Sequence, residues 1–235
     1  MRDQDGRPTG HEVIDGVELP SYRGDIINGI AFEPASRKPD PQRLIEAYHQ
    51  SAATLNLLRA FAMGGYAALS NVHRWTLDFI DKTPQAARYR EIADHISDAL
   101  AFMEACGVTS ETAVQLNETE FYTSHEGLNL IYESAQTRRV PRKAGWFDLT
   151  THLPWIGERT RSLDGAHVEF ARDITNPIGV KLGPTTTPAE ALALADALDP
   201  DHTPGRLTFI TRMGAGRIRT ALPPVVEAVR DSGHP

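Results

Sequence analysis

The 235-residue sequence contains only one cysteine, Cys106, so it cannot form a disulfide bond within the chain. We interpret Cys106 as a small buried side chain near a helix end, in a protein that resides in a reducing, cytoplasmic compartment. No apolar run approaches the roughly 18 residues that a membrane-spanning helix needs. The first residues, Met-Arg-Asp-Gln-Asp-Gly-Arg-Pro, are too polar for a signal peptide.

Basic residues are outnumbered by acidic ones. The chain has 24 lysines and arginines against 31 aspartates and glutamates, which gives a net charge of −7. An acidic chain does not support binding to nucleic acid or to a membrane surface. A negatively charged ligand would therefore have to be held by a few cations gathered in a cleft.

The first part of the chain is expected to be mainly helical. We predict a polar N-terminal segment over 1–41, of which 1–20 is extended or loose, followed by a helical region over 42–145. Apolar residues recur there at the spacing of one helix face, and a run of basic residues forms a solvated loop. The expected helices cover 42–63, 66–82, 84–106 and 125–136, and the basic loop covers 137–143.

From residue 146 onward, predicted strands alternate with predicted helices. This alternation is typical of βαβ units with a parallel sheet, and three such units are visible. A closed (β/α)8 barrel needs eight units, so we predict an α/β fold in which 146–235 form part of a TIM barrel, in a single truncated barrel domain. The expected strands are 147–156, 177–182 and 206–211, and the expected helices are 162–174, 188–198 and 215–232.

Charged residues lie at the end of each predicted strand. Glu158 and Arg159 follow the first strand, Lys181 ends the second, and Arg212 follows the third. The C-terminal ends of parallel barrel strands converge on one mouth, where active sites form. Arginine binds phosphate and carboxylate through a planar fork, and lysine adds a point charge. The pattern predicts a site for a small polyanion, and a salt-bridge network around the mouth is the alternative.

Glycines and histidines add weaker signals. Gly157, Gly183 and Gly214 flank the charged residues and would allow a ligand to approach the backbone closely. The segment 183–188 could bind phosphate at a helix N-terminus or could only cap that helix through a threonine. The nine histidines show no zinc-binding spacing, and only His125 and His152 are kept as candidate site residues.

Five motifs together carry a resemblance to a known family: LPSYRGD at 19–25, YTSHE at 122–126, WIGERT at 155–160, VKLGP at 180–184 and TRMG at 211–214. From about residue 16 to the end, the chain resembles the class II (plant and actinobacterial type) 3-deoxy-D-arabino-heptulosonate 7-phosphate (DAHP) synthases. The resemblance implies a homo-oligomeric (β/α)8 barrel enzyme. It would condense phosphoenolpyruvate with erythrose 4-phosphate, in the first step of the shikimate pathway to aromatic amino acids.

The resemblance also assigns roles to residues. It implies that Glu158, Arg159, Lys181 and Arg212 bind phosphoenolpyruvate, with Lys181 and Glu158 catalytic, and that Arg159 also lies near the phosphate of erythrose 4-phosphate. In the family, the extra helical pair that corresponds to 42–106 serves subunit contacts and feedback regulation.

The complete enzyme would also use a divalent metal such as Mn²⁺ or Co²⁺. Its ligand segments, among them an upstream Gly-Gly-Asp-Cys, are absent from this sequence. We therefore expect the chain to be a central portion of the enzyme that alone binds no catalytic metal and turns over no substrate.

Two other readings stay open. The chain could be a non-catalytic regulatory or remnant subunit that binds a partner, or it could belong to a secondary-metabolite enzyme with an aminated product. Flanking DNA that encodes Gly-Gly-Asp-Cys upstream and Cys-Asp-Pro-Met-His downstream would favour a portion of an ordinary synthase.

Overall fold

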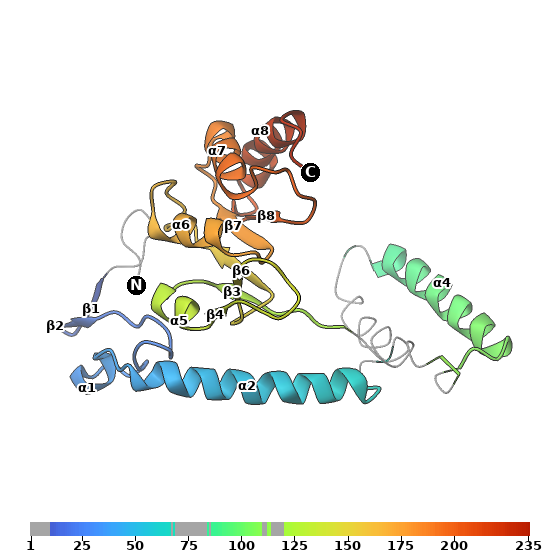
Figure 1. Ribbon diagram of the computed structural model, residues 1–235, viewed down its shortest axis with the longest axis horizontal. Helices are drawn as coiled ribbons and strands as arrows, with labels where there is room; N and C mark the ends of the chain where they lie inside the picture. The colour runs from blue at the N-terminus through green and yellow to red at the C-terminus, as the bar shows by residue number, and fades with distance from the viewer. Residues whose placement is uncertain (1–9, 67, 69–83, 85, 110–111, 114–119) are drawn as a thin grey trace. The chain divides into compact units, whose positions relative to one another are not determined.

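The computed structural model describes residues 10–66, 68, 84, 86–109, 112–113 and 120–235. The chain divides into two compact units, residues 1–121 and 122–235, which are considered separately below (Figure 1). Most of the helix predicted over 66–82 lies outside the described residues.

Unit 1 begins with a β-hairpin, so the described part of the segment 1–20, which was predicted to be extended or loose, is extended, although the hairpin itself was not predicted. Strands β1 (His11–Ile14) and β2 (Val17–Pro20) pair antiparallel. The two residues between them, Asp15 and Gly16, both have positive φ angles, of 50° and 80°. Tight hairpin turns require this backbone conformation, and Asp-Gly is among the pairs that adopt it most readily. The Asp15-Gly16 pair therefore marks a hairpin that the polar composition of the segment did not reveal.

Two long helices follow the short helix α1 (Pro34–Arg37). Helix α2 (Gln42–Met63) has the bounds that the sequence predicts, and α4 (Ala86–Ala105) confirms the helix predicted over 84–106. Ala93 is the one residue of α4 that is buried. Cys106 follows the last turn of this exposed helix and is itself exposed, so its prediction as a buried side chain is wrong.

Unit 2 contains a four-stranded parallel sheet whose strand order is β3-β6-β7-β8. A helix follows each of the last three strands, which confirms the predicted alternation, and Figure 1 shows α6, α7 and α8 gathered beside β7 and β8. The elements are β3 (Ser124–Glu126), β6 (Leu153–Ile156), α6 (Ala166–Asp173), β7 (Ile178–Leu182), α7 (Pro188–Leu198), β8 (Leu207–Thr211) and α8 (Ile218–Asp231).

Two predicted elements of unit 2 are wrong. The helix predicted over 125–136 is shorter, because Asn129 caps α5 (Leu130–Ala135) by accepting hydrogen bonds from two backbone N–H groups of its first turn. His125 and Glu126 instead belong to β3, which the sequence did not reveal as a fourth parallel strand.

The strand predicted over 147–156 is also interrupted. It forms β5 (Phe147–Asp148), which pairs antiparallel with β4 (Thr137–Arg138), and then the separate strand β6. Between them, the Asp148 carboxylate accepts a hydrogen bond from the Thr150 backbone N–H at 3.0 Å and so turns the chain.

The two faces of the parallel sheet differ. Ile178, Val180 and Leu182 of β7 are at most 1% exposed and belong to a core shared with residues of α6, α7 and α8. Side chains alternate between faces along a strand, so Lys181 lies on the opposite face. The described residues thus form an open mixed α/β unit, and its completion as part of a barrel stays a prediction.

Candidate functional site

The charged residues at the strand ends lie along one edge of the parallel sheet. Glu126 is the last residue of β3, Glu158 and Arg159 follow β6, and Lys181 is the second-last residue of β7. Arg212 follows β8 directly and donates its backbone N–H to the Leu182 carbonyl oxygen at 2.8 Å. The sheet therefore brings the four predicted site residues to its C-terminal edge, together with one carboxylate that was not predicted.

Lys181 is held by that additional carboxylate. Its Nζ lies 2.8 Å from Glu126 Oε2, and the two side chains are 16% and 31% exposed. The same ammonium lies 4.9 Å from the centre of the Trp155 ring, within the range of a cation–π contact. Glu126 is in register with Trp155, so both rise from the same face of the sheet as Lys181.

Glu158 connects the loops that follow β6 and β7. Its Oε2 accepts a hydrogen bond from the Gly183 backbone N–H at 2.6 Å, and its Oε1 accepts one from Arg161 at 3.1 Å. Arg161 also donates to Thr186 Oγ1 at 3.1 Å. Both carboxylate oxygens of Glu158 are thus already engaged. Arg161 was missed in the sequence, although its i,i+3 spacing from Glu158 was a usable signal.

Two of the three predicted glycines make room for these carboxylates. A Cβ added at Gly157 would lie closer to Glu126 Oε1 than real Cβ atoms come to any neighbour. A Cβ added at Gly183 would lie 2.7 Å from Glu158 Oε1. Gly214 differs, because its Cβ position is open and its φ is 72°. The space at Gly157 and Gly183 is thus filled by carboxylates of the chain itself, and the approach of a ligand there stays a prediction.

Arg159 and Arg212 have side chains available for a ligand. Both residues are exposed, and neither forms an ion pair or a side-chain hydrogen bond with any residue of the described ranges. This distinguishes them from Lys181 and Arg161, whose charged groups are paired with carboxylates.

The N-terminus of α7 is occupied by its own capping residues. Thr187 Oγ1 accepts the Glu190 backbone N–H at 3.2 Å, and Glu190 Oε2 accepts the Thr187 backbone N–H at 2.8 Å. These reciprocal bonds form a capping box. Of the two readings of 183–188, the structure therefore shows helix capping.

His125 belongs to a buried polar cluster on the other face of the sheet from Glu126. Its Nε2 lies 3.1 Å from both oxygens of Glu133, whose Oε2 accepts the Thr150 hydroxyl at 2.6 Å. Thr150 Oγ1 also lies 2.7 Å from Asp148 Oδ1. Asp148 and Glu133 are 1% and 3% exposed. A hydroxyl has only one proton to donate, so it cannot serve both carboxylates at once.

The pKa values in this cluster diverge. Burial raises the pKa of Asp148 to about 6, and the nearby Glu133 adds to that rise. Burial also opposes ionisation of Glu133, but hydrogen bonds from His125 and Thr150 outweigh it and lower the pKa of that carboxyl. The hydrogen bond to Glu133 raises the pKa of His125 despite burial. Asp148 therefore keeps its proton to a higher pH than a free aspartate does, while the contact between His125 and Glu133 favours the charged form of both.

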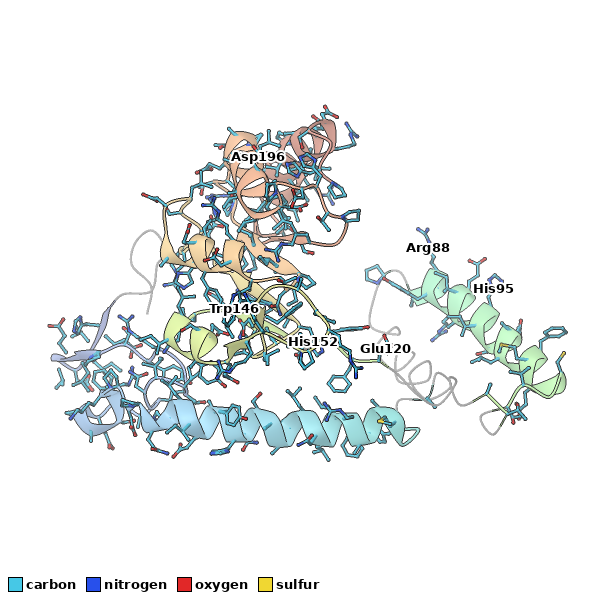
Figure 2. The ribbon with its side chains drawn as sticks, viewed as in Figure 1. Arg88, His95, Glu120, Trp146, His152 and Asp196 are labelled. Carbon is cyan, nitrogen blue, oxygen red and sulfur yellow. The ribbon has the colours of Figure 1, made fainter. Side chains whose placement is uncertain are left out.

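His152 has a structural environment. Its Nδ1 lies 3.1 Å from the Thr123 backbone nitrogen, which donates to it, and its ring packs edge-on against Tyr122 with centroids 5.4 Å apart. Figure 2 labels His152. Neither candidate histidine therefore lies among the cations at the C-terminal edge of the sheet.

The described residues are not grouped as a metal centre would require. Within the described ranges, no group of three or more histidine, cysteine, aspartate or glutamate side chains could hold a metal ion. His125 is instead bonded directly to Glu133, and the Thr150 hydroxyl lies between Glu133 and Asp148.

Comparison with known proteins gives the family. The model of the class-II DAHP synthetase family matches residues 5–235. The chain belongs to this family. A phospho-2-dehydro-3-deoxyheptonate aldolase from Streptomyces coelicolor is 54% identical to it over 227 residues, which cover 97% of this chain and 49% of that protein. The protein of the same name from Mycolicibacterium smegmatis is 48% identical over 226 residues, covering 94% of this chain and 48% of that protein.

Membership of the class-II DAHP synthetase family confirms the resemblance seen in the five motifs. The chain spans about half the length of the curated relatives it matches. In the described part of the chain, no helix combines the length and the apolar character that crossing a bilayer would take.

Proposed function

We propose that this chain provides the phosphoenolpyruvate-binding part of a DAHP synthase, which condenses phosphoenolpyruvate with erythrose 4-phosphate and releases phosphate. Membership of the class-II family supports the reaction, as do two relatives named phospho-2-dehydro-3-deoxyheptonate aldolase. The sheet edge described above supports the place of binding.

The observation that carries the proposal is the gathering of cations at this edge, two of them without partners among the described residues. Phosphoenolpyruvate has a phosphate and a carboxylate, and each can accept two parallel hydrogen bonds from an arginine fork. Arg159 and Arg212 are exposed and supply two such forks, while Lys181 supplies a compact charge between their strands. The chain as a whole is acidic, so this local concentration of positive charge is not explained by composition.

We propose roles for these residues from their places at the sheet edge and from the family resemblance. Arg159 and Arg212 bind the anionic groups, and Arg159 also reaches the phosphate of erythrose 4-phosphate. Lys181 faces the substrate as a fixed positive charge that stabilises negative charge developing during the condensation. Glu158 acts at the substrate site by holding Gly183 and Arg161 in place, through the 2.6 Å and 3.1 Å hydrogen bonds of its carboxylate.

The test is binding of phosphoenolpyruvate to the 235-residue chain, measured by isothermal titration calorimetry. Loss of one charge-assisted contact costs about 1.5–3 kcal/mol, so Arg159→Ala and Arg212→Ala should each weaken binding by about 10- to 100-fold. Arg219→Ala is the matched control, because Arg219 is an exposed arginine of α8. Equal affinities for all three variants would refute the assignment.

A further inference from the structure

We propose that Glu126 is a positioning residue, which holds the Lys181 ammonium in the place where it meets the substrate. The expected effect on substrate binding rests on the proposed function, because Lys181 belongs to the proposed anion site. Glu126 lies outside the motif positions that the resemblance assigns to substrate binding, and the sequence pattern placed it in a helix.

Three features of the structure converge on this role. Glu126 Oε2 is 2.8 Å from Lys181 Nζ, and the lysine side chain is only 16% exposed. Trp155 supports the ammonium from a second direction at 4.9 Å. Gly157 leaves open the space that Glu126 Oε1 occupies. A lysine stem is flexible, so a carboxylate and a ring that both hold its end confine it to one place.

The backbone fixes the carboxylate in turn. Glu126 pairs in register with Trp155 across β3 and β6, and the next residue, Gly127, donates its N–H to the Trp155 carbonyl oxygen at 3.0 Å. The lysine, the carboxylate and the ring thus rise from three adjacent strands of one sheet. A site built on strands holds its groups more closely than a site built on loops.

A different role for Glu126 would predict an opposite effect on binding. If Glu126 were only a nearby negative charge, it would repel phosphoenolpyruvate, and Glu126→Gln would tighten binding whether or not Lys181 were present. If Glu126 positions Lys181, Glu126→Gln weakens binding in the native background. In a Lys181→Met background it then tightens binding, because only the repulsion is left to remove. The sign of the effect therefore separates the two roles.

The experiment is a double-mutant cycle on the 235-residue chain, with phosphoenolpyruvate titrated by calorimetry in low-salt buffer, where the repulsion that separates the two roles is not screened. We expect Glu126→Gln to weaken binding by about tenfold, because the Lys181 ammonium is no longer held in the place where it meets the substrate. Glu126→Asp should restore part of the affinity. Gly157→Ala should weaken binding similarly, since it displaces the carboxylate without changing any charge. Tightening in both backgrounds, or no change in either, overturns the inference.

A second measurement needs no ligand and separates failure of the inference from failure of the proposed function. The rate of Lys181 acetylation by acetic anhydride is measured by peptide mass spectrometry, with the exposed Lys143 as internal standard. Release from Glu126 should raise the Lys181 rate several-fold in Glu126→Gln and Gly157→Ala, but not in the control Glu169→Gln, whose carboxylate is on α6. An unchanged Lys181 rate overturns the inference even if phosphoenolpyruvate binds. A raised rate without phosphoenolpyruvate binding upholds the Glu126 contact and refutes the proposed function.

Discussion

Replacing Asp148 with asparagine should remove part of the pH dependence of the stability of unit 2. Asp148 is 1% exposed, its Oδ2 forms no hydrogen bond with any residue of the described ranges, and it faces Glu133 and His125 across the Thr150 hydroxyl. Burial raises its pKa from 3.8 to about 6. Asparagine keeps the shape and the oxygen that accepts the Thr150 backbone N–H, but it does not titrate.

The sign and size of the effect follow from linkage. A carboxyl whose pKa is raised by folding costs stability when it is ionised, so stability falls as the pH rises from about 3.8 toward 6. The full penalty is about 3 kcal/mol, of which about half is relieved when the pH is lowered from about 7.5 to about 5. The raised pKa of His125 acts in the same direction, because its stabilising charge is lost as the pH rises.

Glu133 sets the lower limit of the useful range. Its pKa is lowered in the folded state, so its ionised form stabilises the fold above the unfolded value and that stability is lost at lower pH. Near pH 5 most of this contribution is still present. Between about pH 5 and 7.5, the comparison of Asp148→Asn with the native chain therefore reports the Asp148 carboxyl together with its effect on the neighbouring His125.

The assay is urea unfolding followed by tryptophan fluorescence in a Trp75→Phe background. The remaining two of the three tryptophans, Trp146 and Trp155, then report on unit 2 alone. The free energy of unfolding of Asp148→Asn, relative to the native chain, should drop by about 1–2 kcal/mol on going from about pH 7.5 to about 5. Asp201→Asn, at an exposed position, should show no such change. A pH-independent difference for Asp148→Asn would refute the reasoning.

Two further predictions concern the stability of the same unit, measured by urea unfolding. Arg206 donates to the carbonyl oxygens of Leu198, Asn176 and Ala171. Arg206→Ala should cost about 2–4 kcal/mol by leaving those acceptors unpaired, and a loss below about 0.5 kcal/mol would contradict this role. Thr187→Ala should cost about 1 kcal/mol by removing the hydroxyl that accepts the Glu190 backbone N–H, and most of this loss should persist in a chain lacking the Glu190 carboxylate, because that N–H is still there to be capped.

Elements with strong local signals could be predicted closely. The sequence predicted α2 and α7 at their observed bounds, because long apolar repeats, a preceding proline and a threonine cap all act within a few residues. It predicted β7 and β8 to within one residue, because short apolar runs between loops are typical of buried strands.

Elements that depend on distant partners could not be predicted. β3 has only three residues, and nothing in Ser-His-Glu marks a strand. Its extended conformation is stabilised by pairing with β6, which starts 27 residues after β3 ends. The missed strand is the reason that Glu126 was missed, since a helical assignment separates it from Lys181. The prediction of the site thus failed at a long-range pairing and not at the recognition of residue types.

Gly157 and Gly183 nevertheless indicate where the carboxylates of Glu126 and Glu158 lie. In each case a carboxylate from one strand or its loop fills the space left by a glycine that follows the next strand: Glu126 over Gly157, and Glu158 over Gly183. The repetition stops at Gly214, where a Cβ would meet nothing within 4 Å. Each carboxylate then binds a cation of the site, Lys181 or Arg161. In this sheet, a glycine directly after a parallel strand therefore indicates that a carboxylate of the preceding strand, or of its loop, packs across the two strand ends. By this pattern, Gly157 in Trp-Ile-Gly-Glu-Arg indicates the position of Glu126.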